Sequence, residues 1–90
     1  IENKIKSLIV YLKTHRINKE SVAYIGNDLN DLECMKFVGF PVCPADACKE
    51  VKSISNIILR SKGGEGVIRE FYDIIQPHIH VDKHEQNRLR

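Results

Sequence analysis

Three short apolar runs, separated by segments with a different periodicity, constrain the fold of this chain more than any other feature of its sequence. The runs are VAYI at 22–25, FPVCP at 40–44 and NIILR at 56–60. Their length and their β-branched and aromatic content are typical of short buried strands. The segments around them have helical spacing, so the predicted order is α-β-α-β-α-β-α. That alternation favours a parallel sheet with helices on its faces.

Amphipathic patterns predict where the helices lie. The first helix is expected over about residues 1–16, with one apolar face made of Ile1, Ile5, Leu8, Ile9 and Leu12. A short helix is predicted over 29–38, one or two helical turns over 45–51, and a last helix over 67–75 that Pro77 ends. Three strands make about half of a doubly wound domain, and the pattern indicates its C-terminal half.

Size and charge exclude several classes of protein. A 90-residue chain forms one small domain, which buries only about 60–65% of the surface that its unfolded form exposes. The net charge of +2 is small and its charges are interspersed, so we expect no nucleic-acid partner. No apolar run approaches the ~20 residues that span a membrane. The first residue is Ile1, and we expect a fragment of a longer protein.

The cysteines indicate a reducing environment. Cys34, Cys43 and Cys48 are odd in number and lack the C-x-x-C spacing of zinc sites. Each has apolar neighbours, as a buried free thiol does. We therefore expect reduced cysteines and a cytoplasmic protein.

The acidic loop after the first strand is the clearest candidate site. Residues 26–31 read GNDLND, and ligands of open parallel sheets bind beyond the carboxyl ends of the strands. Two carboxylates and two amide oxygens within five residues are the hard ligands that Mg²⁺ takes. The same residue types also cap helices, and spacing alone leaves both interpretations open.

Longer motifs extend this loop into a recognisable pattern. The stretch VAYIGNDLNDLECMKFVGFPVCPADA, followed by SKGGEGVIREFYDII, resembles the haloacid dehalogenase-like phosphatases. Within them it is similar to the capless branch that acts on 3-deoxy-D-manno-octulosonate 8-phosphate, and to the C-terminal module of acylneuraminate cytidylyltransferases. The resemblance covers about residues 1–76. It implies the C-terminal half of a Rossmannoid three-layer α/β/α fold over 1–77, followed by a polar tail over 78–90.

The resemblance also implies roles for particular residues. Asn27, Asp28 and Asp31 match the Mg²⁺-holding motif, and Gly26 matches a position beside the bound phosphate. Lys4 lies 22 residues before Gly26, as the lysine does that binds phosphate and balances the charge of the nucleophile. Mg²⁺ and a cation neutralising phosphate oxygens suit phosphoryl transfer.

Two departures from the family pattern bear on activity. Asn27 stands where many active phosphatases have Asp, so we expect weaker Mg²⁺ binding. The chain contains neither the D-x-D-x-T/V nucleophile motif nor a strand to present it. We therefore expect this chain to be inactive by itself.

The C-terminal segments give weaker signals. The loop at 61–66 reads SKGGEG and matches neither the Walker pattern nor G-x-G-x-x-G. In the resembled family this segment lies close to an active site of a tetramer, so Arg69 is expected to meet a substrate carboxylate or phosphate, or else to lie on a solvated helix face. His80 and His84 have i, i+4 spacing, but we expect a solvated tail rather than a metal site.

Two functions follow from the resemblance. The first is a fragment of a Mg²⁺-dependent phosphatase for phosphorylated 3-deoxy-2-ulosonic acids, in the context of Kdo or sialic acid biosynthesis. The alternative is the oligomerisation module of an acylneuraminate cytidylyltransferase with little or no phosphatase activity. In both we expect a homotetramer of the full-length protein and a sugar-acid phosphate as the small-molecule partner. A helix-capping loop in an unrelated small α/β domain stays open as a third interpretation.

Overall fold

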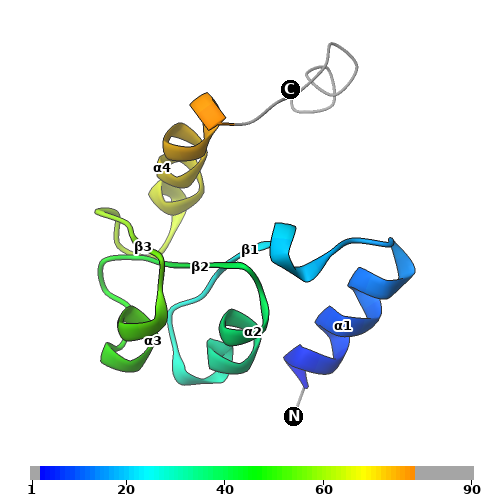
Figure 1. Ribbon diagram of the computed structural model, residues 1–90. Coiled ribbons are helices and arrows are strands. Elements are labelled where there is room, and N and C mark those ends of the chain that lie inside the picture. The colour runs from blue at the N-terminus through cyan, green and yellow to red at the C-terminus, as the bar shows by residue number, and fades with distance from the viewer. Residues whose placement is uncertain (1–2, 79–90) are drawn as a thin grey trace.

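The computed structural model describes residues 3–78 (Figure 1). Within these residues four α-helices and three strands alternate, and the order predicted from the sequence is confirmed. The elements are α1 Lys4–Thr14, β1 Ala23–Ile25, α2 Leu32–Phe37, β2 Phe40–Cys43, α3 Lys49–Ile54, β3 Ile57–Ile58 and α4 Glu65–Ile75. Three short 3₁₀ turns accompany them: η1 Lys19–Ser21, η2 Leu29–Asp31 and η3 Gln76–His78.

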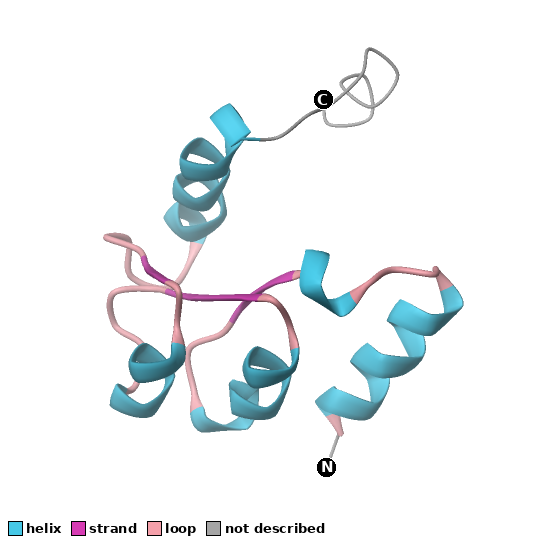
Figure 2. Cartoon of the chain, in the orientation of Figure 1, coloured by secondary structure: helices cyan, strands magenta, loops and turns pink. Residues whose placement is uncertain are grey.

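The strands form one parallel sheet in the order β1-β2-β3, with β2 in the middle. Ala23 is opposite Phe40, and Cys43 is opposite Ile58. The sheet lies between α4 on one side and α1, α2 and α3 on the other (Figures 1 and 2). This three-layer arrangement confirms the predicted fold class.

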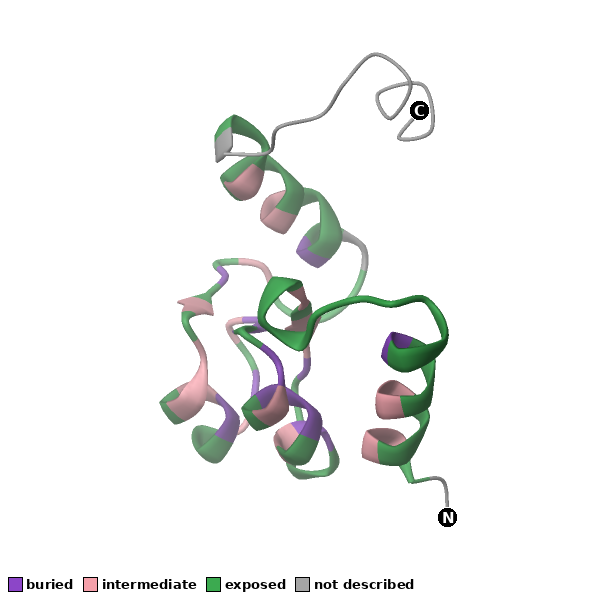
Figure 3. Cartoon of the chain, turned by 45° about the vertical axis from the view of Figure 1, so that its right-hand side comes forward, coloured by how far each residue is buried: buried purple, intermediate pink, exposed green. Residues whose placement is uncertain are grey.

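The core is divided by the sheet into two clusters, because successive side chains of β2 point to opposite faces. Val42 packs with Leu59 and Val67 on the α4 side, while Cys43 packs with Met35 and Val51 on the other side. In Figure 3 the buried segments lie on the strands and on parts of the helices beside them, while much of the remaining helix surface is exposed. The three cysteines are free, and Cys34 and Cys43 are buried, as predicted.

Helix α1 has the amphipathic character that its sequence predicts. Leu12 is buried and Ile5, Leu8 and Ile9 are half-buried, whereas Val10 is exposed. The Asn3 side chain caps the helix by accepting a hydrogen bond from the Lys6 N–H at 3.2 Å. Asn18 caps the following 3₁₀ turn, because its side chain accepts a hydrogen bond from the Glu20 N–H at 3.0 Å.

The helical turns predicted over 45–51 are wrong at their start. Helix α3 begins only at Lys49, because the backbone before it is bonded to other segments. The Ala45 N–H donates to the Ser61 carbonyl at 2.8 Å, and the Cys48 N–H donates to the Asn27 carbonyl at 3.0 Å. These bonds tie the loop after β2 to the loops that follow β1 and β3.

The polar tail predicted for 78–90 lies, from residue 79 on, outside the described residues, as do His80 and His84. The domain boundary at 77 therefore stays a prediction. Among the helices of residues 3–78, none has the length and apolar content needed to cross a membrane.

Candidate functional site

The acidic loop, residues 26–31, lies at the carboxyl end of β1, where the sheet order predicts a site. Gly26 extends the pairing of β1 because its N–H donates to the Val42 carbonyl at 3.0 Å. Asp28 then caps the turn η2, and its side chain accepts from the Leu29 N–H at 2.7 Å. The Asp31 side chain accepts from the Asp28 N–H at 3.3 Å and completes a capping box.

Asp31 is the anchor of this loop. It is 6% exposed, and each of its carboxylate oxygens accepts two hydrogen bonds. One oxygen accepts from the Lys4 Nζ at 3.0 Å and from the Tyr24 hydroxyl at 3.2 Å. The other accepts from the backbone N–H groups of Asn27 at 3.1 Å and Asp28 at 3.3 Å. A buried carboxylate thus fixes strand, loop and α1 together.

The surroundings of Asp31 keep its carboxyl group ionised. Burial alone would raise its pKa, but the hydrogen bonds from Lys4, Asn27 and Asp28 and the lysine charge outweigh burial and lower the pKa. Burial, with Cys34 and Asp31 beside the ring, raises the pKa of Tyr24. Tyr24 therefore stays protonated and donates its hydroxyl hydrogen.

Glycine at position 26 is required by close packing. A Cβ at Gly26 would lie 2.7 Å from both the Asp31 Cβ and the Met35 Sδ. Gly26 is buried and its backbone has a normal negative φ, so the need is for space. Its expected contact with phosphate stays a prediction.

Asn27 and Asp28 are exposed, in contrast to Asp31. Beside them an open cleft of about 190 Å³ runs between the end of β1, the end of β2 and the start of α4. Its lining residues are Ile25, Gly26, Asn27, Pro44, Gly63, Gly64, Val67 and Ile68. Within residues 3–78, no three His, Cys, Asp or Glu side chains gather as a ready-made metal cage.

The structure therefore does not bring all the predicted site residues together. Lys4 and Asp31 form an ion pair, and Asn27 lines the cleft. Arg69 lies on an exposed part of α4, where its Nε is 3.4 Å from Asp73 Oδ1. Its expected contact with substrate stays a prediction. The metal-binding roles of Asn27, Asp28 and Asp31 also stay predictions, although the four bonds to Asp31 favour an anchoring role for it.

Sequence reasoning missed three residues that hold the two loops beside the cleft. Tyr24 donates to Asp31, while Asp46 and Glu70 accept hydrogen bonds from the glycine-rich loop after β3. The partners of Asp46 and Glu70 are 9 to 17 residues away, beyond any helical or capping spacing. A signal for Tyr24 existed, since it lies in the predicted strand at 22–25, directly before the acidic loop.

A family model, that of the haloacid dehalogenase-like hydrolases, matches residues 2–71. The chain belongs to this family.

Among its relatives is the 3-deoxy-D-manno-octulosonate 8-phosphate phosphatase of Yersinia pestis, which is 42% identical over 64 residues, covering 71% of this chain and 34% of the relative. Phosphoglycolate phosphatase 1 of Saccharolobus solfataricus is 44% identical over 57 residues, covering 63% of this chain and 25% of the relative. This chain therefore spans about a third or less of these two curated relatives.

Solved structures of the haloacid dehalogenase-like hydrolases have the same fold. The 3-deoxy-D-manno-octulosonate 8-phosphate phosphatase of Moraxella catarrhalis, in complex with a magnesium ion, a phosphate ion and a KDO molecule, superposes with a TM-score of 0.78 at 31% identity. The superposition covers 83% of this chain and 43% of that one. The resemblance to this phosphatase branch is confirmed.

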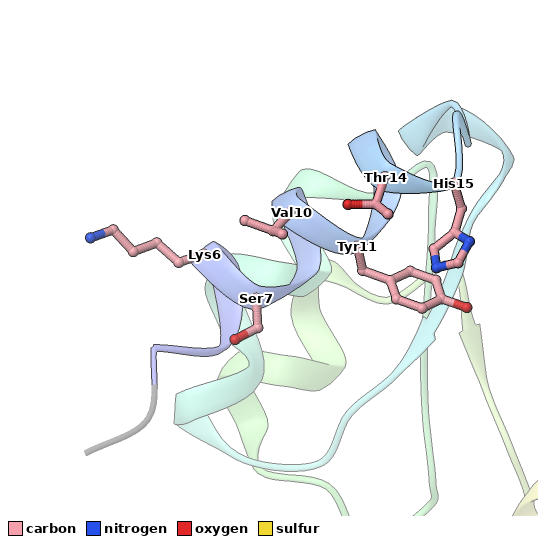
Figure 4. Close-up of a pocket in the computed structure, with 6 residues that line it drawn as sticks. All are labelled: Lys6, Ser7, Val10, Tyr11, Thr14 and His15. Carbon is pink, nitrogen blue, oxygen red and sulfur yellow. The ribbon is translucent and has the colours of Figure 1, made fainter.

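A second hollow, on α1, is larger but contains none of the predicted site residues. It has a volume of about 480 Å³ and is formed by exposed residues of one helix: Lys6, Ser7, Val10, Tyr11, Thr14 and His15 (Figure 4). The rings of Tyr11 and His15 lie 4.3 Å apart at its edge. In this chain the cleft beside Asn27, at the carboxyl end of the sheet, remains the candidate functional site.

Proposed function

We propose that this chain is part of a Mg²⁺-dependent phosphatase that hydrolyses phosphorylated 3-deoxy-2-ulosonic acids. The observation that carries the proposal is the ion pair between the buried Asp31 and Lys4, beneath a loop on which Asn27 and Asp28 are exposed and Asn27 lines a cleft. The relatives that act on 3-deoxy-D-manno-octulosonate 8-phosphate support this substrate class.

The residues of the acidic loop suit Mg²⁺. The ion takes oxygen ligands and usually keeps several waters while it binds one or two carboxylates and the substrate phosphate. Asp28 offers a carboxylate and Asn27 an amide oxygen. Because the amide has no charge, we expect a weaker metal site than a pair of aspartates would form. When bound, the metal would neutralise charge that develops on the phosphate oxygens.

Lys4 supplies the second positive charge. Its ammonium group is held against Asp31 at 3.0 Å, and its side chain is 39% exposed, so it also faces solvent near the loop. An ammonium at this place can bind phosphate and balance the charge of an attacking carboxylate. The sequence has no D-x-D motif, and we propose that another segment of the full-length protein supplies the nucleophile.

The proposal also covers the assembly, the cellular location and the pathway of the full-length protein. A cytoplasmic homotetramer acting in Kdo or sialic acid biosynthesis is the form expected from the resemblance. Nucleic acid and membranes are not expected partners.

One observation favours the alternative, an oligomerisation module of an acylneuraminate cytidylyltransferase. Asn27 replaces the aspartate of many active phosphatases, and the resemblance associates GND loops with those modules. In that case the full-length protein would transfer a cytidylyl group and release little phosphate.

The test is phosphate release by the full-length protein from 3-deoxy-D-manno-octulosonate 8-phosphate, with and without Mg²⁺. We expect turnover that requires Mg²⁺ and falls about 100-fold in Lys4→Gln and Asp28→Ala, as on removal of one charge-stabilising group. Asn27→Asp is expected to lower the Mg²⁺ concentration for half-maximal rate. Unchanged turnover in both loss variants would contradict the site, and no turnover by the wild type would contradict the function.

A further inference from the structure

The glycine loop, residues 61–64, forms the side of the cleft opposite Asn27. Gly63 and Gly64 line the cleft, as do Gly26 and Asn27 of the acidic loop. Both glycines are exposed, and a Cβ at Gly64 would meet no described atom within 4 Å. Packing therefore does little to hold this wall in place.

Glu70 holds the start of the glycine loop from α4. One carboxylate oxygen accepts from the Arg60 N–H at 2.8 Å, and the other accepts from the Ser61 N–H at 2.7 Å. Both distances are typical of charge-assisted hydrogen bonds. The pKa of Glu70 is lowered, chiefly by the hydrogen bond from the Arg60 N–H and to a smaller extent by hydrogen bonds from Ser61. The carboxylate is therefore ionised at neutral pH.

Asp46 holds the other end of the loop from the opposite direction. It follows β2, and its Oδ1 accepts from the Gly63 N–H at 2.9 Å. The backbone bond from Ala45 to Ser61 runs beside it. Gly64, the next residue, has φ 117° and ψ −153°, a conformation that is essentially restricted to glycine. Two carboxylates from other segments, Glu70 and Asp46, thus hold the backbone of this loop at both ends.

We infer that Glu70 and Asp46 are positioning residues for the proposed reaction, because they set the width of the cleft between the glycine loop and Asn27. The inference rests on the proposed function. The phosphate would lie on the side of Lys4 and the acidic loop, so the rest of the substrate would lie against the glycine loop. Glu70 and Asp46 therefore govern binding of the sugar acid, and a small phosphate ester that does not reach the loop is insensitive to them.

The experiment compares two substrates with the full-length protein, 3-deoxy-D-manno-octulosonate 8-phosphate and p-nitrophenyl phosphate. The variants are Glu70→Ala, Glu70→Gln, Asp46→Ala and Asp46→Asn. The control is Glu50→Ala, which removes an exposed carboxylate from α3. Amide hydrogen exchange at Arg60, Ser61 and Gly63 is measured in each protein.

For Glu70→Ala we expect kcat/KM of the sugar substrate to fall by about tenfold, as for loss of a charge-assisted hydrogen bond, chiefly through KM. Glu70→Gln is expected to behave similarly, since its amide NH₂ cannot accept from a second N–H. Asp46→Ala has a smaller effect, and Asp46→Asn restores wild-type KM because its amide oxygen still accepts from Gly63. With p-nitrophenyl phosphate, all five variants resemble the wild type.

Several outcomes would overturn the inference. One is an unchanged KM in Glu70→Ala, and another is an equal loss on both substrates, which indicates a merely structural role. Exchange at Arg60 and Ser61 that is as fast in the wild type as in Glu70→Ala would also overturn it. A wild type that hydrolyses neither substrate contradicts the proposed function itself, and the inference falls with it.

Discussion

The acidic loop and the glycine loop border the same cleft, but they are held in place in different ways. The acidic loop contains its own anchor, since Asp31 bonds to the backbone three and four residues before it. The backbone of the glycine loop is held instead by Asp46 and Glu70, which belong to other segments. One loop is organised locally and the other by tertiary structure.

That difference favours different roles for the two loops in the site. Groups that bind a metal and phosphate need fixed geometry, which a buried ionised carboxylate such as Asp31 supplies. A wall made of glycine backbone can approach a ligand closely but must be supported from outside. We therefore expect substitutions in the acidic loop to affect stability and turnover together, and substitutions around the glycine loop to affect mainly substrate binding.

The largest effect is expected at Asp31. Asp31→Ala leaves the Lys4 ammonium, the Tyr24 hydroxyl and two backbone N–H groups without their acceptor, and we expect a loss of about 3 kcal/mol in the free energy of unfolding. Denaturant unfolding of the full-length protein measures it. Glu70→Ala is the matched comparison from the other loop, and an equal or larger loss there would contradict the contrast.

A smaller loss of stability is expected when a glycine of either loop is replaced by alanine. Gly26→Ala forces a Cβ against Asp31 and Met35, and we expect a loss of about 2 kcal/mol from overpacking. Gly64→Ala meets no neighbour but must adopt a positive φ, for which we expect about 1 kcal/mol. Thermal unfolding of both variants tests the order. A larger loss for Gly64→Ala would mean that conformation matters more than space.

The fold is expected to be sensitive to acid through Asp31. The pKa of Asp31 is lower in the folded protein than its ordinary value of 3.8. The ionised carboxylate therefore contributes its full stabilisation of the fold when the pH is above 3.8. That contribution is lost as the pH falls through the lowered pKa. We expect stability to decline below about pH 4 in the wild type and to decline less steeply in Asp31→Asn. Parallel curves from pH 5 to pH 2 would contradict this.

The smallest effect on stability is expected at Arg69. Its side chain is 82% exposed and pairs only loosely with Asp73, so Arg69→Ala is expected to change the free energy of unfolding by less than about 0.5 kcal/mol. Its effect on KM for the sugar substrate tests the predicted substrate contact. Values equal to those of the wild type would place Arg69 outside the site.

The contrast between the loops also explains what the sequence could predict. The strands and the helix α1 follow from spacing over a few residues, and these predictions are confirmed. For the acidic loop, spacing left helix capping and metal binding open, and the structure shows that Asp28 and Asp31 cap the turn η2. The late start of α3 could not be read from the sequence, because bonds from Ala45 and Cys48 to distant carbonyls decide it. The roles of Asp46 and Glu70 were hidden for the same reason, since their partners become neighbours only in the folded chain.

The most direct test of the account is a Mn²⁺ titration of the full-length protein, with Mn²⁺ in place of Mg²⁺, followed by paramagnetic broadening of its amide signals. We predict that Asn27 and Asp28 broaden first, that Gly63 and Gly64 across the cleft follow, and that Asp28→Ala removes the effect. Broadening centred elsewhere, or unchanged in Asp28→Ala, would contradict the claim that the acidic loop is the metal-binding side of the site.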